Sequence, residues 1–141
     1  MKKIYIASSW RNTLQPDVVR ELRAAGHDVY DFRNPPGRVG FRWDAVDPGW
    51  RDWTSADYRR ALSHPVAQGG FKSDFDAMQW ADTCVLVLPC GRSAHLEAGW
   101  MVGKGKRVYV LQTSPEEPEL MYLMADGICL TSSELLGRLS G

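Results

Sequence analysis

The sequence predicts an α/β fold: a single flavodoxin-like, doubly wound domain with a five-stranded parallel sheet of order 2-1-3-4-5 and helices on both faces. Short β-branched runs alternate with helical stretches, and this alternation is typical of parallel sheets with right-handed crossovers. The run 83–88 is apolar on both faces, as a strand inside a parallel sheet requires. With 141 residues, of which 44% are hydrophobic, the chain is long enough for one domain with a full core.

Each element follows from local signals. The strands are predicted at 3–7, 27–32, 83–88, 107–111 and 128–130. A helix over 16–25 fits between the first two strands, because Pro16 suits a first helical turn and Gly26 can end a helix.

The later helices are expected to begin at hydroxyl residues, whose side-chain oxygens accept hydrogen bonds from the free amides of a helix start. The predicted caps are Thr54 or Ser55, then Ser73, Ser93, and Ser132 or Ser133. The helix from Ser73 would turn Phe75, Met78 and Trp80 inward. A further helix is predicted over 116–124.

One long segment interrupts this regular pattern. Residues 33–58 are rich in glycine, proline and aromatic side chains. We expect a single domain over 1–141 in which this segment covers the pocket and sets specificity, with Trp43 in contact with substrate. Packing of these aromatic rings on the sheet, or in a subunit interface, is the alternative.

Charge and cysteine content exclude several classes of protein. The 17 basic and 17 acidic residues balance, which argues against a nucleic-acid polymer as partner. Three cysteines cannot form a fully paired disulfide framework, so a reducing cytoplasm fits best. No apolar run approaches the ~18 residues of a membrane span. His95-x-Glu97 lacks the following P-C-x-x-C of a zinc deaminase, so we expect no metal and no cofactor.

The predicted strand order locates a ligand site without any motif. In sheets of this order, ligands bind beyond the carboxyl ends of the first and third strands. Two segments lie there, Ser8–Arg11 and Pro89–Ser93, and the second continues into a helix that carries Glu97. Gly91 frees the backbone of this second loop, and Ser93 is suited to cap the helix.

Glu97 is the first candidate for chemistry, about one turn inside this helix. The helix dipole favours an ionised carboxylate there by a few tenths to ~1 kcal/mol. Such a carboxylate beside a ligand crevice can act as a nucleophile or a general base. The alternative is an ordinary solvated glutamate in a first helical turn.

The loop after the first strand suits an anion or a sugar hydroxyl, because Ser9 and Arg11 offer a hydroxyl and a guanidinium. Trp10 beside them could stack on a base. An ordinary polar turn, with Arg11 paired to a nearby carboxylate, explains the same residues. Asp74 could join Glu97 in glycoside chemistry, where two carboxylates lie roughly 5 Å apart in the retaining case. A helix cap is the simpler interpretation of Asp74.

Three segments share their order and strand context with a known enzyme family. They are the opening Ile4–Arg11, then Asp74 followed by the pair Ala81–Asp82, and Gly91–Gly99 around Glu97. Together they resemble the nucleoside 2-deoxyribosyltransferase family, including its relative, the 2′-deoxynucleoside 5′-phosphate N-hydrolase. The loop before Glu97 is one residue shorter than in the N-hydrolase, which leaves the role of Ser93 open.

The resemblance implies a reaction and roles for residues. Glu97 would attack C1′ of a 2′-deoxynucleoside, Asp74 would transfer protons to or from the base, and Tyr5 would position Glu97. The sugar would pass from Glu97 to another free base or to water. Glu119 and Met121 fall near a position that, in the family, reaches the site of a neighbouring subunit, so a homodimer or larger homo-oligomer is expected.

Other functions stay open at this point. Ser9 and Arg11 resemble the phosphate-contacting loop of the N-hydrolase, which favours a nucleoside 5′-monophosphate and hence an N-glycoside hydrolase. A carboxylate at Glu119 would repel phosphate and favours an unphosphorylated nucleoside. NAD glycohydrolysis and a catalytically inactive nucleotide-binding module are the further alternatives.

Overall fold

A computed structural model describes residues 1–140, and the chain forms two compact units. The first comprises Met1–Asp31 together with the chain from Met78 onward, and the second is Phe32–Ala77. The single domain expected over the whole chain stays a prediction. None of the helices within residues 1–140 is long and apolar enough to cross a membrane.

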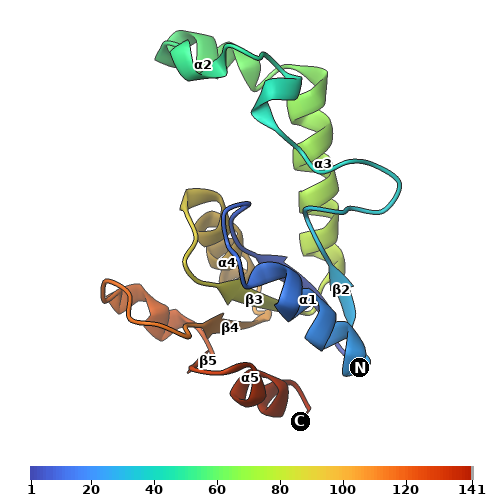
Figure 1. Ribbon diagram of the computed structural model, residues 1–141, viewed down its shortest axis with the longest axis vertical. Helices are drawn as coiled ribbons and strands as arrows, with labels where there is room; N and C mark the ends of the chain where they lie inside the picture. Colours follow the sequence, from blue (N-terminus) through green and yellow to red (C-terminus); the bar gives the residue numbers. More distant parts are fainter. Residues whose placement is uncertain (141) are drawn as a thin grey trace. The chain divides into compact units, whose positions relative to one another are not determined.

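The first unit contains the predicted sheet. Five parallel strands follow the order β2-β1-β3-β4-β5 (Figure 1). They are β1 (Lys3–Ala7), β2 (Asp28–Tyr30), β3 (Thr83–Val87), β4 (Arg107–Leu111) and β5 (Gly127–Cys129). All residues of β3 are buried, which confirms the interpretation of its continuous apolar run. The predicted fold class is therefore confirmed.

Alternate strand residues point to opposite faces of this sheet, so each face has its own packing. Helices α1 (Gln15–Ala24) and α5 (Ser132–Leu139) pack on one face. The core there consists of Ile4, Ile6, Val18, Val19, Leu22, Val85, Val87, Tyr109, Leu111, Cys129, Leu135 and Leu139. Helix α4 (Arg92–Gly103) packs against β1, β3 and β4 and buries Ala94, Ala98 and Met101. The phenol of Tyr5 reaches α4, which places this helix on the opposite face.

The amino ends of β1 and β3 are joined by one carboxylate. Asp82 accepts hydrogen bonds from the backbone amide of Lys3 at 3.2 and 3.3 Å and from the hydroxyl of Thr83 at 2.7 Å. Since Asp82 ends the connection into β3, this contact fixes where β3 begins beside β1.

The second unit contains the aromatic segment and two helices. Its elements are the short 3₁₀ helices η1 (Trp43–Ala45) and η2 (Trp50–Asp52), helix α2 (Ser55–Ala61), and most of α3 (Pro65–Trp80), whose last turn belongs to the first unit. The ring of Trp43 makes edge contacts with three aromatic rings, those of Phe41, Trp53 and Tyr58. These four aromatic rings of the segment therefore form one cluster around Trp43.

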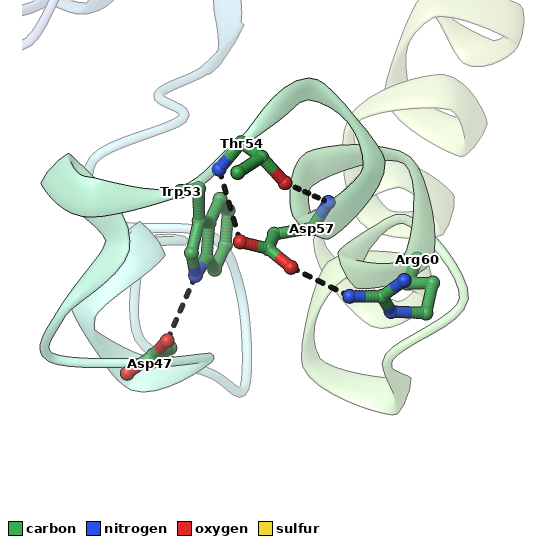
Figure 2. A network of polar contacts seen from close by, with 5 residues as sticks. All are labelled: Asp47, Trp53, Thr54, Asp57 and Arg60. Carbon is green, nitrogen blue, oxygen red and sulfur yellow. Dashed lines mark hydrogen bonds and ion pairs between the residues drawn. The ribbon is translucent and has the colours of Figure 1, made fainter.

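A polar network holds the turn before α2 (Figure 2). Asp47 accepts a hydrogen bond of 2.8 Å from the indole of Trp53, and this contact lowers the pKa of Asp47. Thr54 and Asp57 form a reciprocal capping box at the start of α2, and Asp57 also pairs with Arg60 at 2.5 Å. Hydrogen bonds from Thr54 lower the pKa of Asp57. These carboxylates serve the fold of the segment.

Several predicted helix boundaries are wrong. Helix α3 begins at Pro65, so Ser73 lies well inside it and caps nothing. Proline suits a helix start, and Gly70 in α3 leaves room for Phe41, whose side chain would lie 2.9 Å from an added Cβ. Trp80, the last residue of α3, is 41% exposed, so it does not turn inward as predicted.

Two further boundaries differ because another residue provides the cap. Gly91 precedes α4, so Ser93 lies in its first turn. Thr131 caps α5 by accepting a hydrogen bond from the amide of Glu134. The helix expected over 116–124 is only the 3₁₀ helix η3 (Leu120–Met124).

Lys106 provides a test of how α3 ends. Its ammonium group donates to the carbonyls of Met78, Gln79 and Ala81 at 2.8, 2.8 and 2.5 Å. Lys106→Met should lower the free energy of unfolding in urea by about 1–3 kcal/mol, because charge-assisted hydrogen bonds to free carbonyls are lost.

Lys104→Met is the matched control for this substitution. Lys104 and Lys106 lie 5.6 and 5.7 Å from the ring centre of Trp100, but of these two lysines only Lys106 is found bound to carbonyls of α3 within residues 1–140. Equal destabilisation by both substitutions would mean that the carbonyl contacts are unimportant.

Candidate active site

The loops that follow β1 and β3 are bound to each other at the carboxyl edge of the sheet. The hydroxyl of Ser8 donates to the carbonyl of Val87 at 2.9 Å. The amide group of Asn12 donates to the carbonyls of Val87 and Pro89 at 3.3 and 3.0 Å. The side-chain oxygen of Asn12 also accepts from two backbone amides at the start of α1, at 2.8 Å each. Asn12, which is 3% exposed, thus ties both loops to α1.

Tyr5 and Glu97 form the central contact beneath these loops. The phenol of Tyr5 donates to Oε2 of Glu97 at 2.6 Å. Tyr5 is fully buried between neighbouring strands, opposite Cys84 in β3, and its ring stacks on Tyr30 at 5.5 Å. A short hydrogen bond from a fixed hydroxyl stabilises the charged form of a carboxylate and orients it. The half-buried Glu97 is therefore held in one position.

Two cysteine thiols lie close enough to Glu97 for its negative charge to raise their pKa values. Burial first, and then Glu97, raises the pKa of Cys90 to about 12. The same two causes raise the pKa of the fully buried Cys84. Neither thiol is a nucleophile at neutral pH, because the thiolate is the reactive form. Glu97 differs from both thiols, because the hydrogen bond from Tyr5 favours its charged form.

The start of α4 is open to a ligand. Gly91 precedes the helix in an extended conformation, and an added Cβ there would meet nothing within 4 Å. Ser93 lies exposed in the first turn. Free amides at a helix start, together with the helix dipole, favour an anion or a polar oxygen.

The loop after β1 places three predicted residues at the same edge. Ser9 is half-buried, and its hydroxyl accepts from the amide of Arg11 at 3.1 Å. The guanidinium of Arg11 is exposed and forms no ion pair within residues 1–140, so the expected alternative of a paired arginine is not what the structure has. Trp10 is 48% exposed.

Glu119 and Met121 border a separate cavity. Glu119 begins η3, and its carboxylate accepts from the amide of Met121 at 2.8 Å. The cavity measures about 230 Å³ and lies between α4, β3, β4 and η3. Its walls are Leu86, His95, Ala98, Gly99, Val102, Val108, Val110, Glu119, Met121, Tyr122, Met124 and Ala125. Tyr5 and Glu97 are not among them.

The remaining predicted residues belong to the second unit. Asp74 lies in the interior of α3 and is half-buried, so the expectation that it occupies a first turn is wrong. Trp43 is half-buried among Phe41 and the other rings of its cluster. Within the first unit, the structure unites Tyr5 with Glu97 and brings their loops together.

Sequence reasoning missed the residues that bind the parts of this edge to one another. Asn12 had a detectable signal, since asparagine before a helix commonly binds the first amides. The contact of His95 with Tyr122, at 2.9 Å between Nε2 and the hydroxyl, had none, because the two residues are 27 positions apart.

Comparisons with known proteins bear on the fold of this chain. Neither a family model nor a curated protein matches the sequence. A 2-deoxyribosyltransferase from Bacillus psychrosaccharolyticus has a similar structure, with a TM-score of 0.71 and 20% sequence identity over 94% of this chain and 89% of that one. The chain shares its fold with this enzyme.

Two further solved structures are similar. The CMP N-glycosidase BcmB of Clostridium botulinum matches over 99% of this chain and 100% of its own, at a TM-score of 0.54 and 17% identity. A conserved protein from Enterococcus faecalis V583 matches over 99% of this chain and 98% of its own, at a TM-score of 0.61 and 15% identity.

Cys90 can report on the charge of Glu97. At pH 8, iodoacetamide should alkylate Cys90 at least about 100-fold more slowly than a free thiol, because the pKa of about 12 leaves little thiolate. Glu97→Gln should accelerate this reaction, since a neutral amide no longer opposes the negative thiolate. Mass spectrometry of the peptide that contains Cys90 gives the rate.

The control is Glu117→Gln, which removes an exposed carboxylate that is not among the groups that raise the pKa of Cys90. An unchanged rate in Glu97→Gln would contradict the electrostatic contact between Glu97 and Cys90.

Proposed function

We propose that this protein is an N-glycosyl transferase or hydrolase that cleaves the N-glycosidic bond of a 2′-deoxynucleoside through a covalent intermediate on Glu97. The observation that carries the proposal is the 2.6 Å hydrogen bond from the buried Tyr5 to Glu97. A carboxylate held in this way, beside the open start of a helix, is suited to attack a sugar carbon.

In the first step, one carboxylate oxygen of Glu97 forms a bond to C1′ as the bond from C1′ to the base nitrogen breaks. The base leaves with the bonding electrons and takes up a proton, which we assign to Asp74. The hydrogen bond from Tyr5 keeps the carboxylate of Glu97 oriented toward C1′. The negative charge of this carboxylate is lost as the glycosyl ester forms.

In the second step, the nitrogen of another base, or the oxygen of water, attacks C1′ and restores the carboxylate of Glu97. The proton of the incoming nucleophile returns to Asp74. A 2′-deoxy sugar suits this chemistry, because its oxocarbenium-like transition state lacks an electron-withdrawing 2′-hydroxyl.

We assign binding of the sugar to the two joined loops. Ser9, Arg11, Gly91 and Ser93 supply hydroxyls, amides and a cation there, and the exposed Arg11 has no ion pair within residues 1–140. Trp10 would stack on the base. Trp43 is assigned to the same base through the second unit, although its ring packs in an aromatic cluster.

The group at the 5′ position decides between two substrates. Glu119 would repel a phosphate and accept a hydrogen bond from a 5′-hydroxyl, which favours a nucleoside. The alternative is hydrolysis of a 2′-deoxynucleoside 5′-monophosphate, which the cationic Arg11 favours. The similar structures include a 2-deoxyribosyltransferase, whose name supports transfer of a 2-deoxy sugar, and a CMP N-glycosidase, whose name supports hydrolysis of a nucleoside 5′-monophosphate that carries a 2′-hydroxyl.

A mechanism-based probe tests the nucleophile. After reaction with a 2′-fluoro-arabino nucleoside, mass spectrometry should find a glycosyl adduct on Glu97. Glu97→Gln should form no adduct and lose about 1,000-fold or more in turnover, whereas Tyr5→Phe should lose about 10- to 100-fold, because Glu97 is no longer oriented. Glu117→Gln is the matched control and should keep full activity.

The same assay separates the alternatives. Release of free base from a substrate alone indicates hydrolysis, and exchange only after a second base is added indicates transfer. Full glycosidic activity of Glu97→Gln would contradict the proposal. A bound nucleotide without turnover would instead favour the catalytically inactive module.

We also propose that the protein forms a homodimer or larger homo-oligomer through an aliphatic surface of the first unit. Seven large side chains of α4, η3 and the end of β5 are 48–82% exposed, namely Leu96, Leu120, Met121, Leu123, Met124, Ile128 and Leu130. A standard interface buries about 800 Å² on each partner, and a set of large exposed apolar side chains suits such a surface. Met121 and Met124 of this set also line the 230 Å³ cavity, so projecting side chains and a hollow lie next to each other, as a two-fold interface requires.

Leu123 provides the test of this surface, since it is 82% exposed. Leu123→Asp should convert the oligomer to a monomer in light scattering, because a carboxylate would have to be buried. Val39→Asp, at an 86% exposed position of the second unit, should leave the mass unchanged. A monomeric native protein would refute the interface.

A further inference from the structure

His95 binds two segments that are distant in the sequence. Its Nδ1 lies 2.8 Å from the carbonyl oxygen of Gly91, and its Nε2 lies 2.9 Å from the hydroxyl of Tyr122. The rings of His95 and Tyr122 are nearly parallel, with centres 5.8 Å apart. One imidazole on α4 therefore contacts both the loop before its own helix and the 3₁₀ helix η3.

These contacts define the tautomer of His95. A carbonyl oxygen can only accept, so Nδ1 must carry the hydrogen that it donates to Gly91. In the neutral ring Nε2 is then an acceptor, and the hydroxyl of Tyr122 donates to it. The thiol of Cys90, 3.8 Å from Nδ1, is the third polar neighbour of the ring.

One polar side-chain contact joins η3 to α4 within the described chain, beside an apolar cavity that residues of both elements line. Leu120 and Leu123 of η3 are 74% and 82% exposed, whereas Tyr122 is half-buried. The residues between β4 and η3 form no helix or strand, so their backbone does not fix η3 either. The orientation of η3 consequently depends on side-chain contacts, of which the bond from Tyr122 to His95 is the polar one directed at α4.

We propose that His95 and Tyr122 are a positioning pair that holds η3, and with it Glu119 and Met121, against α4. Neither residue touches the reacting atoms. Glu119 and Met121 lie within three residues of Tyr122, and Gly91 accepts from the other side of the imidazole. The proposal rests on the proposed function, because it assigns the pair to recognition of the 5′ end of the substrate through Glu119, which in the proposed oligomer serves the site of a neighbouring copy.

A positioning role predicts a specific change in kinetics. Tyr122→Phe keeps the ring and removes only the donor, so KM should rise about five- to tenfold, as expected for one lost hydrogen bond. The value of kcat should change less than twofold, because Tyr5 and Glu97 are untouched. His95→Ala should have a similar effect, and the double variant should be no worse than either single one.

Tyr109→Phe is the matched control, since it removes the hydroxyl of a tyrosine whose ring packs in the core with residues of α1 and α5, on the face of the sheet opposite α4. It should leave both KM and kcat unchanged. An unchanged KM in Tyr122→Phe, or additive losses in the double variant, would overturn the proposal.

Two measurements on the free protein separate this proposal from the proposed function. Nitrogen NMR of the neutral His95 ring should show a protonated Nδ1 and an unprotonated Nε2. Hydrogen exchange of the amides of 120–124 should accelerate in Tyr122→Phe and not in Tyr109→Phe. The opposite tautomer, or unchanged exchange, would refute the pair even in an active enzyme. An inactive protein with both expected results would refute only the enzymatic assignment.

Discussion

The parallel pairing of β1 with β3 is the constraint on which the rest of the first unit depends. Because the two strands run side by side in the same direction, their carboxyl ends open at one edge, and the loops that follow them must meet there. Asn12 and Ser8 use this proximity to bind the loops together. The start of α4 then lies beside β1, and only in this arrangement can the buried phenol of Tyr5 reach Glu97.

The sequence was sufficient to predict this arrangement because its signals are local and strong. The continuous apolar run of β3 and the β-branched runs of β1 and β4 have no competing interpretation, and the strand order follows from their alternation with helices. The rule for ligands at the switch point then selected the loops that contain Ser9 and Gly91. Tyr5 entered through family resemblance alone, since a tyrosine in a buried strand is ordinarily a core residue.

Other features depend on contacts between distant residues and could not be predicted. Gly70 lies inside α3, where Phe41 packs directly against it, and this contact joins residues that are distant in the sequence. The capping signals at Ser73 and Ser93 are real but weak, and tertiary packing overrides them. The hydrogen bond between His95 and Tyr122 joins α4 to η3, whose sequence has no regular hydrophobic periodicity, so no sequence pattern predicts this contact.

Polar side chains fasten the β1–β3 pair at both of its ends: Asp82 at the amino edge and Asn12 at the carboxyl edge. Side chains alternate along a strand, so a slip of one residue would turn Tyr5 toward α1 and bring Ile4 or Ile6 to face α4. Such a slip would have to break both fastenings at once. A chain with shifted strands would therefore lose the contacts of Asp82 and Asn12 together with the hydrogen bond from Tyr5 to Glu97. The same contacts that stabilise the fold thus also select the strand register on which the Glu97 site depends.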